Sequence, residues 1–244
     1  MKRGHWSMAA LLAGALGSAL VGCGGGGDEP VAAADFGETL FQDARLSDST
    51  FNRFSCATCH VTTPETPAGR IDSGPSLYNV AARPDWWGGD ETHLLDAVNF
   101  CYLNFMRGVT KLEAEEPRSR ALYEYLSRIS PDAQAPALPF TVVKDIEDVP
   151  RGDAVRGEAV YRAACQNCHG ATHTGEGRLT ELASVLPEVT QEYDRLFPGI
   201  PHARVVIEKV RHGAFFGVGG SMPPYSREAL SDADLGALLG YLGL

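Results

Sequence analysis

The sequence predicts an all-α protein built from two consecutive helical domains. Two observations lead to this expectation. The pattern Cys-x-x-Cys-His occurs twice, in "FSCATCHV" at 54–61 and in "ACQNCHG" at 164–170. Each copy is followed, further along the chain, by a stretch whose apolar residues have helical spacing. Between the two units, residues 131–152 are rich in Pro and lack helical periodicity, so we expect a linker there.

The N-terminal stretch is not expected to belong to this fold. Lys2 and Arg3 precede the short apolar run 9–21, an arrangement typical of an export signal over residues 1–22. The apolar run is too short to span a bilayer comfortably. Its end, "LVGC", resembles the lipobox of bacterial lipoproteins, which implies lipidation of Cys23. The alternative is an ordinary signal peptide that is cut nearby and leaves Cys23 as a spare thiol.

Residues 23–34 begin with four glycines and continue with polar residues, so they are expected to form a flexible tether. Without residues 1–22 the chain has 19 Lys and Arg against 31 Asp and Glu, a net charge of −12. Such an acidic surface argues against nucleic acid as a partner and favours solubility or a basic partner.

Cys-x-x-Cys-His is the attachment motif of c-type haem. The two thiols form thioethers with one porphyrin, and the adjacent His ligates the iron. Structural zinc would leave both histidines unexplained, a thioredoxin-like pair usually lies near a βαβ pattern, and so short a loop makes a poor disulfide. The sequence therefore predicts two covalently bound haems c. The expected attachment residues are Cys56, Cys59, Cys165 and Cys168, and the expected iron ligands are His60 and His169.

The second domain, 153–244, has helical spacing at 153–164 and again at 235–242. Ser231 and Asp234, just before the second of these stretches, form a capping box. The order of helix, haem motif, "GSMPPY" and closing helix resembles a class I cytochrome c domain. In that family the Met of a Met-Pro loop is the sixth iron ligand, which implies this role for Met222. Arg204 and Arg211 suit either haem propionates or a solvated helix face.

The first domain, 35–130, repeats this plan less faithfully. A helix is expected over 91–106 and a closing helix over 118–130. Met106 and Met222 are the two methionines outside the export signal, which suggests one for each haem. Met106, however, is not followed by Pro and lies at the edge of the apolar stripe, whereas Cys101 lies on the stripe itself. His93, Lys111 and a vacant position stay open as alternatives.

The segment "VNFCYLNFMRG" resembles thiosulfate dehydrogenases and the haem subunit of sulfur-oxidising complexes. There a Cys in an Asn-x-Cys setting ligates the iron, and Asn99, Cys101, Met106 and Gly108 match that spacing. The resemblance implies Cys101 as the sixth ligand of the first haem. The Arg that those families often place shortly after the Cys is missing.

Residues 43–89, with Arg45-Leu46-Ser47 and the Trp86-Trp87 pair, also resemble the first haem domain of bacterial di-haem peroxidases. The second domain departs from that pattern and resembles a carrier. Taken together, the sequence predicts a lipid-anchored, exported di-haem cytochrome that faces the periplasm, expected at the outer membrane. We expect it to pass single electrons between periplasmic or membrane redox proteins. Sulfur-compound oxidation at the first haem is the alternative activity, and peroxide reduction of the di-haem peroxidase kind is a less favoured one.

Overall fold

The structure, a computed structural model, describes residues 32–145 and 148–244. Cys23 lies outside these residues, so its predicted lipidation has no structural counterpart here. The first half of the described chain contains four α-helices: α1 (Ala33–Gln42), α2 (Cys56–Cys59), α3 (Leu94–Asn104) and α4 (Pro117–Arg128). Short 3₁₀ turns lie at Ala44–Leu46, Val80–Ala82 and Trp87–Gly89.

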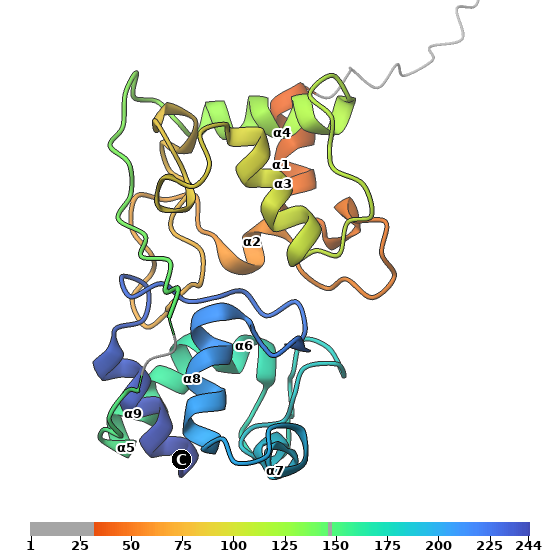
Figure 1. Cartoon of the computed structure of the whole chain (residues 1–244). Coiled ribbons are helices and arrows are strands. Elements are labelled where there is room, and N and C mark those ends of the chain that lie inside the picture. Colours follow the sequence, from red (N-terminus) through yellow and green to blue (C-terminus); the bar gives the residue numbers. More distant parts are fainter. Residues whose placement is uncertain (1–31, 146–147) are drawn as a thin grey trace, which may run out of the picture. The chain divides into compact units, whose positions relative to one another are not determined.

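The second half contains five α-helices: α5 (Ala154–Val160), α6 (Gln166–His169), α7 (Tyr193–Leu196), α8 (His202–His212) and α9 (Asp232–Leu242). A π-helical turn, Tyr161–Cys165, continues α5, and a 3₁₀ turn covers Glu188–Glu192. The strands β1 (Ala214–Phe215) and β2 (Val218–Gly219) form a small antiparallel hairpin. Its turn residues, Phe216 and Gly217, both have positive φ, as a type I′ hairpin requires. The predicted all-α fold class is confirmed (Figure 1).

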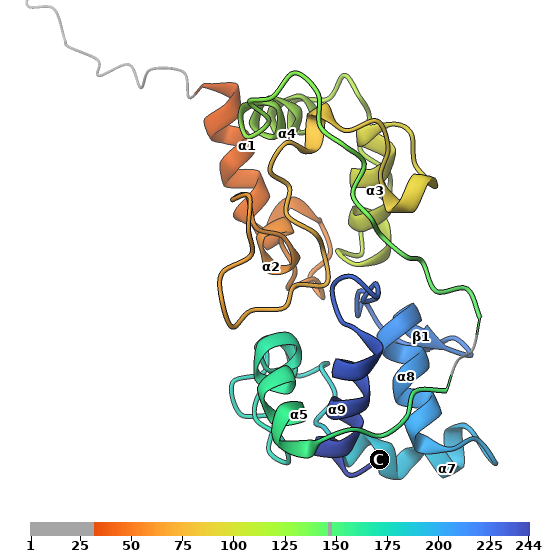
Figure 2. The same ribbon diagram turned by 90° about the vertical axis from the view of Figure 1, so that its left-hand side faces the viewer.

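Both halves are organised around a crossing of their first and last helices. In the first half α1 packs against α4, and in the second α5 packs against α9 (Figure 2). Gly37 lies so close to the carbonyl of Ala121 that an added Cβ would overlap it. Gly157 meets Ala237 in the same way. Glycine therefore sets the closeness of both crossings.

The same crossings carry a matched aromatic pair one helical turn after the glycine. The rings of Phe41 and Tyr125 have centroids 5.3 Å apart, and those of Tyr161 and Tyr241 are 5.6 Å apart. Around each pair lies a separate cluster of buried apolar residues, one within residues 40–126 and one within 160–242. Each half therefore has its own core.

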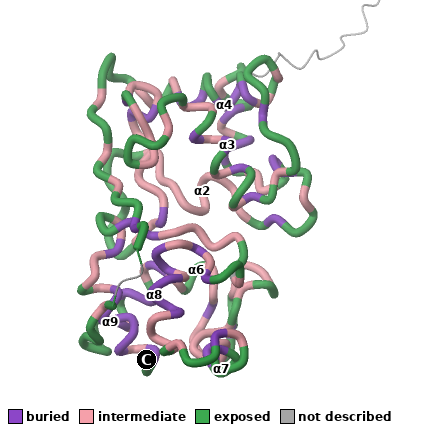
Figure 3. The backbone as a smooth tube through the Cα atoms, in the orientation of Figure 1, coloured by how far each residue is buried: buried purple, intermediate pink, exposed green. Residues whose placement is uncertain are grey.

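The closing helices begin and end where their sequences indicate. Pro117 occupies the first turn of α4, a position where its missing N–H costs nothing. Ser231 caps α9 by accepting a hydrogen bond from the N–H of Asp234 at 3.1 Å, and Gly243 ends the helix at φ 77°. All four leucines of α9 are buried, as Figure 3 shows for the helix as a whole.

Some predicted boundaries differ from the structure. α1 begins two residues before position 35, inside the predicted tether 23–34. The helix expected over 91–106 covers only Leu94–Asn104, because Arg107 turns the chain at φ 58° and the N–H of Gly108 bonds back to Tyr102 at 2.9 Å. Met106 consequently follows the helix. Residues 131–145 and 148–152 contain neither helix nor strand. No helix within 32–145 or 148–244 has the length and apolar character needed to cross a membrane.

Candidate haem-binding sites

The first Cys-x-x-Cys-His motif forms the single-turn helix α2. Ser55 and Thr58 close its N-terminus with reciprocal hydrogen bonds, among them one of 3.0 Å from the Ser55 N–H to the Thr58 hydroxyl. At the other end, the N–H of His60 bonds to the Cys56 carbonyl at 3.0 Å. The i, i+3 spacing of Cys56 and Cys59 places both thiols on the same side of this turn.

A hydrogen bond to the backbone fixes the orientation of the His60 ring. Its Nδ1 lies 2.7 Å from the carbonyl oxygen of Pro75, to which it donates as the Nδ1–H tautomer, so Nε2 is left to bind a metal. The ring packs directly on Gly74, where any Cβ would overlap the imidazole. Burial lowers the pKa of His60, which keeps the ring neutral and able to act as a ligand.

A cavity with about 1280 Å³ of empty space, part of it open to solvent, lies next to this ring. Its walls are mainly apolar. The lining residues from the first half include Phe41, Leu46, Phe54, Cys56, Cys59, His60, Leu77, Val80, Arg83, Trp86, Leu94, Val98, Cys101, Tyr102, Met106, Leu122 and Leu126.

The polar groups of the cavity wall indicate whether the cavity can hold a haem. Within the described chain, the buried Nε1–H of Trp86 has no hydrogen-bond partner. Arg83 is also buried, and its guanidinium donates to the carbonyls of Ser76 and Tyr78 at 2.8 and 2.6 Å. An apolar space with two thiols, an imidazole, an unpaired donor and a buried cation fits a porphyrin, which is apolar in the ring and anionic at its propionates. The residues therefore fit the group that the motif implies.

The structure brings two of the predicted sixth-ligand candidates, Cys101 and Met106, to this cavity. Cys101 lies on α3 near the other two thiols, and burial, followed by the proximity of Cys56 and Cys59, raises its pKa. Met106 is buried, with 4% of its surface exposed. His93 and Lys111 are exposed and are not among the residues that line the cavity, so the geometry does not favour them.

Asn99, which the sequence identifies through its match to the sulfur-oxidising families, also has a structural role. Its side-chain amide is buried on α3, donates to the carbonyl of Leu112 at 3.0 Å and accepts from the Leu112 N–H at 2.7 Å. This pair of bonds holds the end of the loop 105–112, which contains Met106. The sequence does contain a signal for this structural role: Asn99 is a polar residue, two positions before Cys101, in a stripe of apolar residues with helical spacing.

The second motif has a matching proximal side. Cys165 ends the π-helical turn, and Cys168 and His169 follow on α6. The Nδ1 of His169 lies 2.8 Å from the carbonyl of Ser184, which stands 15 positions further along the chain, the same separation as between His60 and Pro75. Burial lowers the pKa of His169 as well. Both histidines are therefore held as Nδ1 donors with Nε2 left for a metal.

Met222 lies in the loop between β2 and α9 and packs against the second core together with Cys165. The loop is tied to the haem motif through Tyr225, whose hydroxyl donates to the Ala164 carbonyl at 2.7 Å. Burial raises the pKa of Tyr225, and the thiols of Cys165 and Cys168 add to the shift. The hydrogen bond therefore ties the Tyr225 end of this loop to the residue before Cys165.

The remaining basic side chains of α8 differ in their surroundings. Arg204 pairs with Asp148 at 2.8 Å at the surface, which agrees with a solvated helix face. For Arg211 that explanation is wrong, because its side chain is 2% exposed and its contacts are to protein groups. His202 pairs with Asp194, His173 with Glu188 and His212 with Glu208.

Comparison with known proteins supports the cytochrome interpretation for the second half. Residues 152–242 match the family described as "Cytochrome C oxidase, cbb3-type, subunit III". Among solved structures, the chain resembles a thiosulfate dehydrogenase (TsdBA) from Marichromatium purpuratum in its as-isolated form, with a TM-score of 0.42 and 17% identity. The likeness covers 86% of this chain and 45% of that chain, so this chain spans less than half of that protein's length. No curated protein matches the chain.

A likeness at this TM-score assigns no activity. The family match by itself supports a c-type cytochrome domain in the C-terminal half, with covalently bound haem c and an electron-transfer role. That half is the one in which the sequence predicts a cytochrome c domain of the Met-ligated kind.

Proposed function

We propose that the chain carries two covalently bound haems c and transfers single electrons between redox partners. The observation that carries the proposal is the matched proximal side of the two motifs. In each, a half-buried His whose pKa is lowered is held through Nδ1 by a backbone carbonyl, next to two free thiols. A bound haem supplies one-electron redox chemistry, and the chain's residues ligate it, orient it and exclude water.

The two sites are proposed to differ on their other side. In the first, Cys101 is the sixth ligand, because it lies on helix α3 and lines the same cavity as the two attachment thiols and His60. In the second, Met222 takes this role. A thiolate lowers the potential of a haem and a thioether raises it, so electrons would pass from the first site to the second.

A second candidate, oxidation of a sulfur compound at the first site, is favoured by one observation. The cavity contains the buried guanidinium of Arg83 as well as Cys101, so an anion that entered it would find both a cation and a sulfur. Arg83 lies before Cys101 in the chain, whereas the Arg of the sulfur-oxidising families follows the Cys. Peroxide reduction, which the resemblance of residues 43–89 to di-haem peroxidases implies, is the less favoured activity, because the second half resembles a Met-ligated carrier.

The setting of the protein is proposed from the N-terminal sequence alone. The export signal and the lipobox-like "LVGC" support an exported protein, anchored by lipid at Cys23 and facing the periplasm, with the outer membrane as the expected location. Its partners would be periplasmic or membrane redox proteins. Replacement of Cys23 by Ser should release the protein from membranes, and a variant that fractionates like wild type would refute the anchor.

The central experiment is an intact mass of the mature protein made in a host with working cytochrome c maturation. The proposal requires two haems per chain, and fewer than two would refute it. Addition of thiosulfate with an artificial electron acceptor then separates the activities. Turnover that is lost in Cys101→Ala would support the sulfur-oxidising candidate, and reduction by protein partners without turnover would support the carrier.

A further inference from the structure

The backbone of Met222 lies close to the end of α8. Gly213 follows the helix directly at φ 77°, and a Cβ on it would lie 2.5 Å from the Met222 carbonyl oxygen. Only glycine combines this backbone conformation with so short a distance. Beyond Met222, two prolines lead to Tyr225, and the fixed φ of each proline makes this connection stiff.

Tyr225 is the point at which this stiff connection is anchored. Its N–H donates to the Val210 carbonyl at 2.8 Å, and its hydroxyl donates to the carbonyl of Ala164, the residue just before Cys165. Its own carbonyl accepts from the guanidinium of Arg211 at 3.0 Å. Any movement of this anchor would therefore be passed to Met222 through only two residues.

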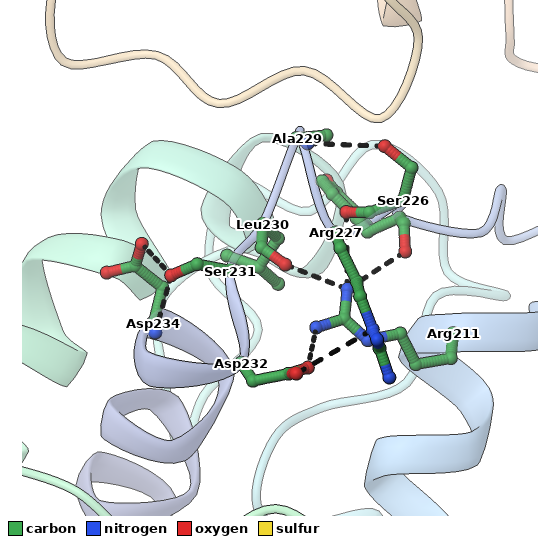
Figure 4. A network of polar contacts seen from close by, with 9 residues as sticks. Arg211, Ser226, Arg227, Ala229, Leu230, Ser231, Asp232 and Asp234 are labelled. Atoms are coloured by element: carbon green, nitrogen blue, oxygen red, sulfur yellow. Dashed lines mark hydrogen bonds and ion pairs between the residues drawn. The ribbon is translucent and has the colours of Figure 1, made fainter. Parts of the chain in front are cut away.

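The buried guanidinium of Arg211 donates hydrogen bonds to the segment that follows Tyr225 (Figure 4). Besides Tyr225, its Nη1 donates to the carbonyls of Ser226 at 3.2 Å and Leu230 at 2.8 Å, and its Nη2 donates to Asp232 at 2.6 Å. Three of these acceptors are backbone carbonyls from the segment between Met222 and α9. A buried guanidinium is costly unless all its donors are used, so the loop has to adopt the path that satisfies it.

We propose that Arg211 is a positioning residue for the second site, which holds Met222 in place for ligation by fixing the backbone of residues 225–232. The inference rests on the proposed role of Met222 and adds the residue that enforces it. Lysine could not replace this function, because a single ammonium cannot reach acceptors that the planar guanidinium contacts with two nitrogens.

The test measures how easily Met222 is displaced. Imidazole is titrated into the oxidised holoprotein, and its half-saturation at the second site is followed spectroscopically, with the first site as an internal reference. If Met222 is unligated in a larger fraction of molecules, imidazole binds at correspondingly lower concentration. Arg211→Lys should lower the half-saturation about tenfold or more, the size typical of lost support behind a metal ligand.

A matched control lies on the same helix. Arg204→Gln removes an exposed ion pair of α8 and should leave the half-saturation unchanged. The decisive comparison repeats Arg211→Lys in a Met222→Ala background, where no ligand is left to position. There the substitution should have no effect on imidazole binding. The same tenfold change in both backgrounds, or no change in either, would overturn the inference.

Two further outcomes separate this inference from the proposed function. If Met222→Ala leaves the second site's spectrum and imidazole affinity as in wild type, the proposed ligand is wrong, and the inference falls with it. If Arg211→Lys does not fold, Tyr225→Phe loosens the same anchor without disturbing the buried charge. It should lower the half-saturation by a smaller factor, and an unchanged value would overturn the inference.

Discussion

The two halves of the molecule share one side of each candidate haem site and differ on the other. On the proximal side, His60 and His169 are supported by carbonyls at the same sequence separation. For the other side we propose Cys101, from inside helix α3, in the first half and Met222, from a loop, in the second. A ligand inside a helix is held by the helix itself, and a ligand on a loop needs a separate support.

The loops that carry the two methionines, Met106 and Met222, are also held by different chemistry. The loop 105–112 is fixed by the neutral amide of Asn99, and residues 225–232 are fixed by the buried cation of Arg211. The two histidines are held alike, so we propose that the two haem sites differ in their properties through the residues on their other side.

The largest expected effect tests whether the halves are independent haem sites. Cys56→Ser with Cys59→Ser should remove one haem, and Cys165→Ser with Cys168→Ser should remove the other, because each pair supplies both thioethers of its own site. Intact mass counts the haems that remain. Retention of both haems in either double variant would contradict the assignment of that motif, and loss of both would show that the halves are not independent.

The next effect concerns the helix crossings. Gly37→Ala and Gly157→Ala each place a Cβ on the backbone of the facing helix, which should destabilise that half by about 3 kcal/mol. Thermal unfolding followed at the haem bands measures this. Gly220→Ala is the control, since a Cβ there meets nothing closer than 4.0 Å. If only one crossing responds, the similarity of the two halves is weaker than the contacts indicate.

A smaller effect is expected at the proximal histidines. Gly74→Ala should push the His60 ring from its position and alter the spectrum and potential of the first haem alone. The second half has Ala183 at the matching position before Ser184, so Ala183→Gly should change little. Equal spectral changes at both haems in Gly74→Ala would show that the substitution acts through the whole fold.

The smallest effect concerns pH and the contact between Glu228 of the second half and Thr141 of the segment before it. Burial of Glu228 opposes its ionisation, but the hydroxyl and N–H of Thr141 donate to its carboxylate and lower its pKa to about 2, from an ordinary value of 4.5. A lowered pKa means that this carboxylate stabilises the fold above pH 4.5 and stops doing so as the pH falls toward 2.

Because Glu228 is exposed, its contribution should be no more than about 1 kcal/mol. Glu228→Gln should lower Tm slightly at pH 7, and its difference from wild type should shrink toward pH 3. In the first half, loop 105–112 is held by hydrogen bonds of the uncharged Asn99 amide. The stability of that loop should therefore show no such pH dependence. A difference between Glu228→Gln and wild type that grows as the pH falls would have the wrong sign.

The features that the sequence predicts well are those encoded by neighbouring residues. The haem motifs and the closing helices depend on local spacing, and α4 and α9 lie where their periodicity indicates. The end of α3 was missed because the left-handed conformation of Arg107, a residue that rarely adopts it, decides where the helix stops.

The features that the sequence does not predict depend on contacts between distant residues. Pro75 and Ser184 support their histidines through backbone carbonyls, which have no residue signature. From the sequence alone Arg211 resembles a surface residue of a helix, whereas in the fold its side chain is buried by the loop 225–232. The helix crossings, in contrast, did leave a signal, since Gly37 and Gly157 are each followed four positions later by an aromatic residue.

We propose that two similar proximal sides are combined with two different sulfur ligands. Low-temperature EPR of the oxidised protein tests it most directly, because thiolate-ligated and thioether-ligated irons give different signals. We expect two distinct low-spin signals, of which Cys101→Ala alters only one and Met222→Ala only the other. If Cys101→Ala leaves both signals unchanged while Met106→Ala alters the first, the thiolate assignment is wrong and both haems have methionine ligands.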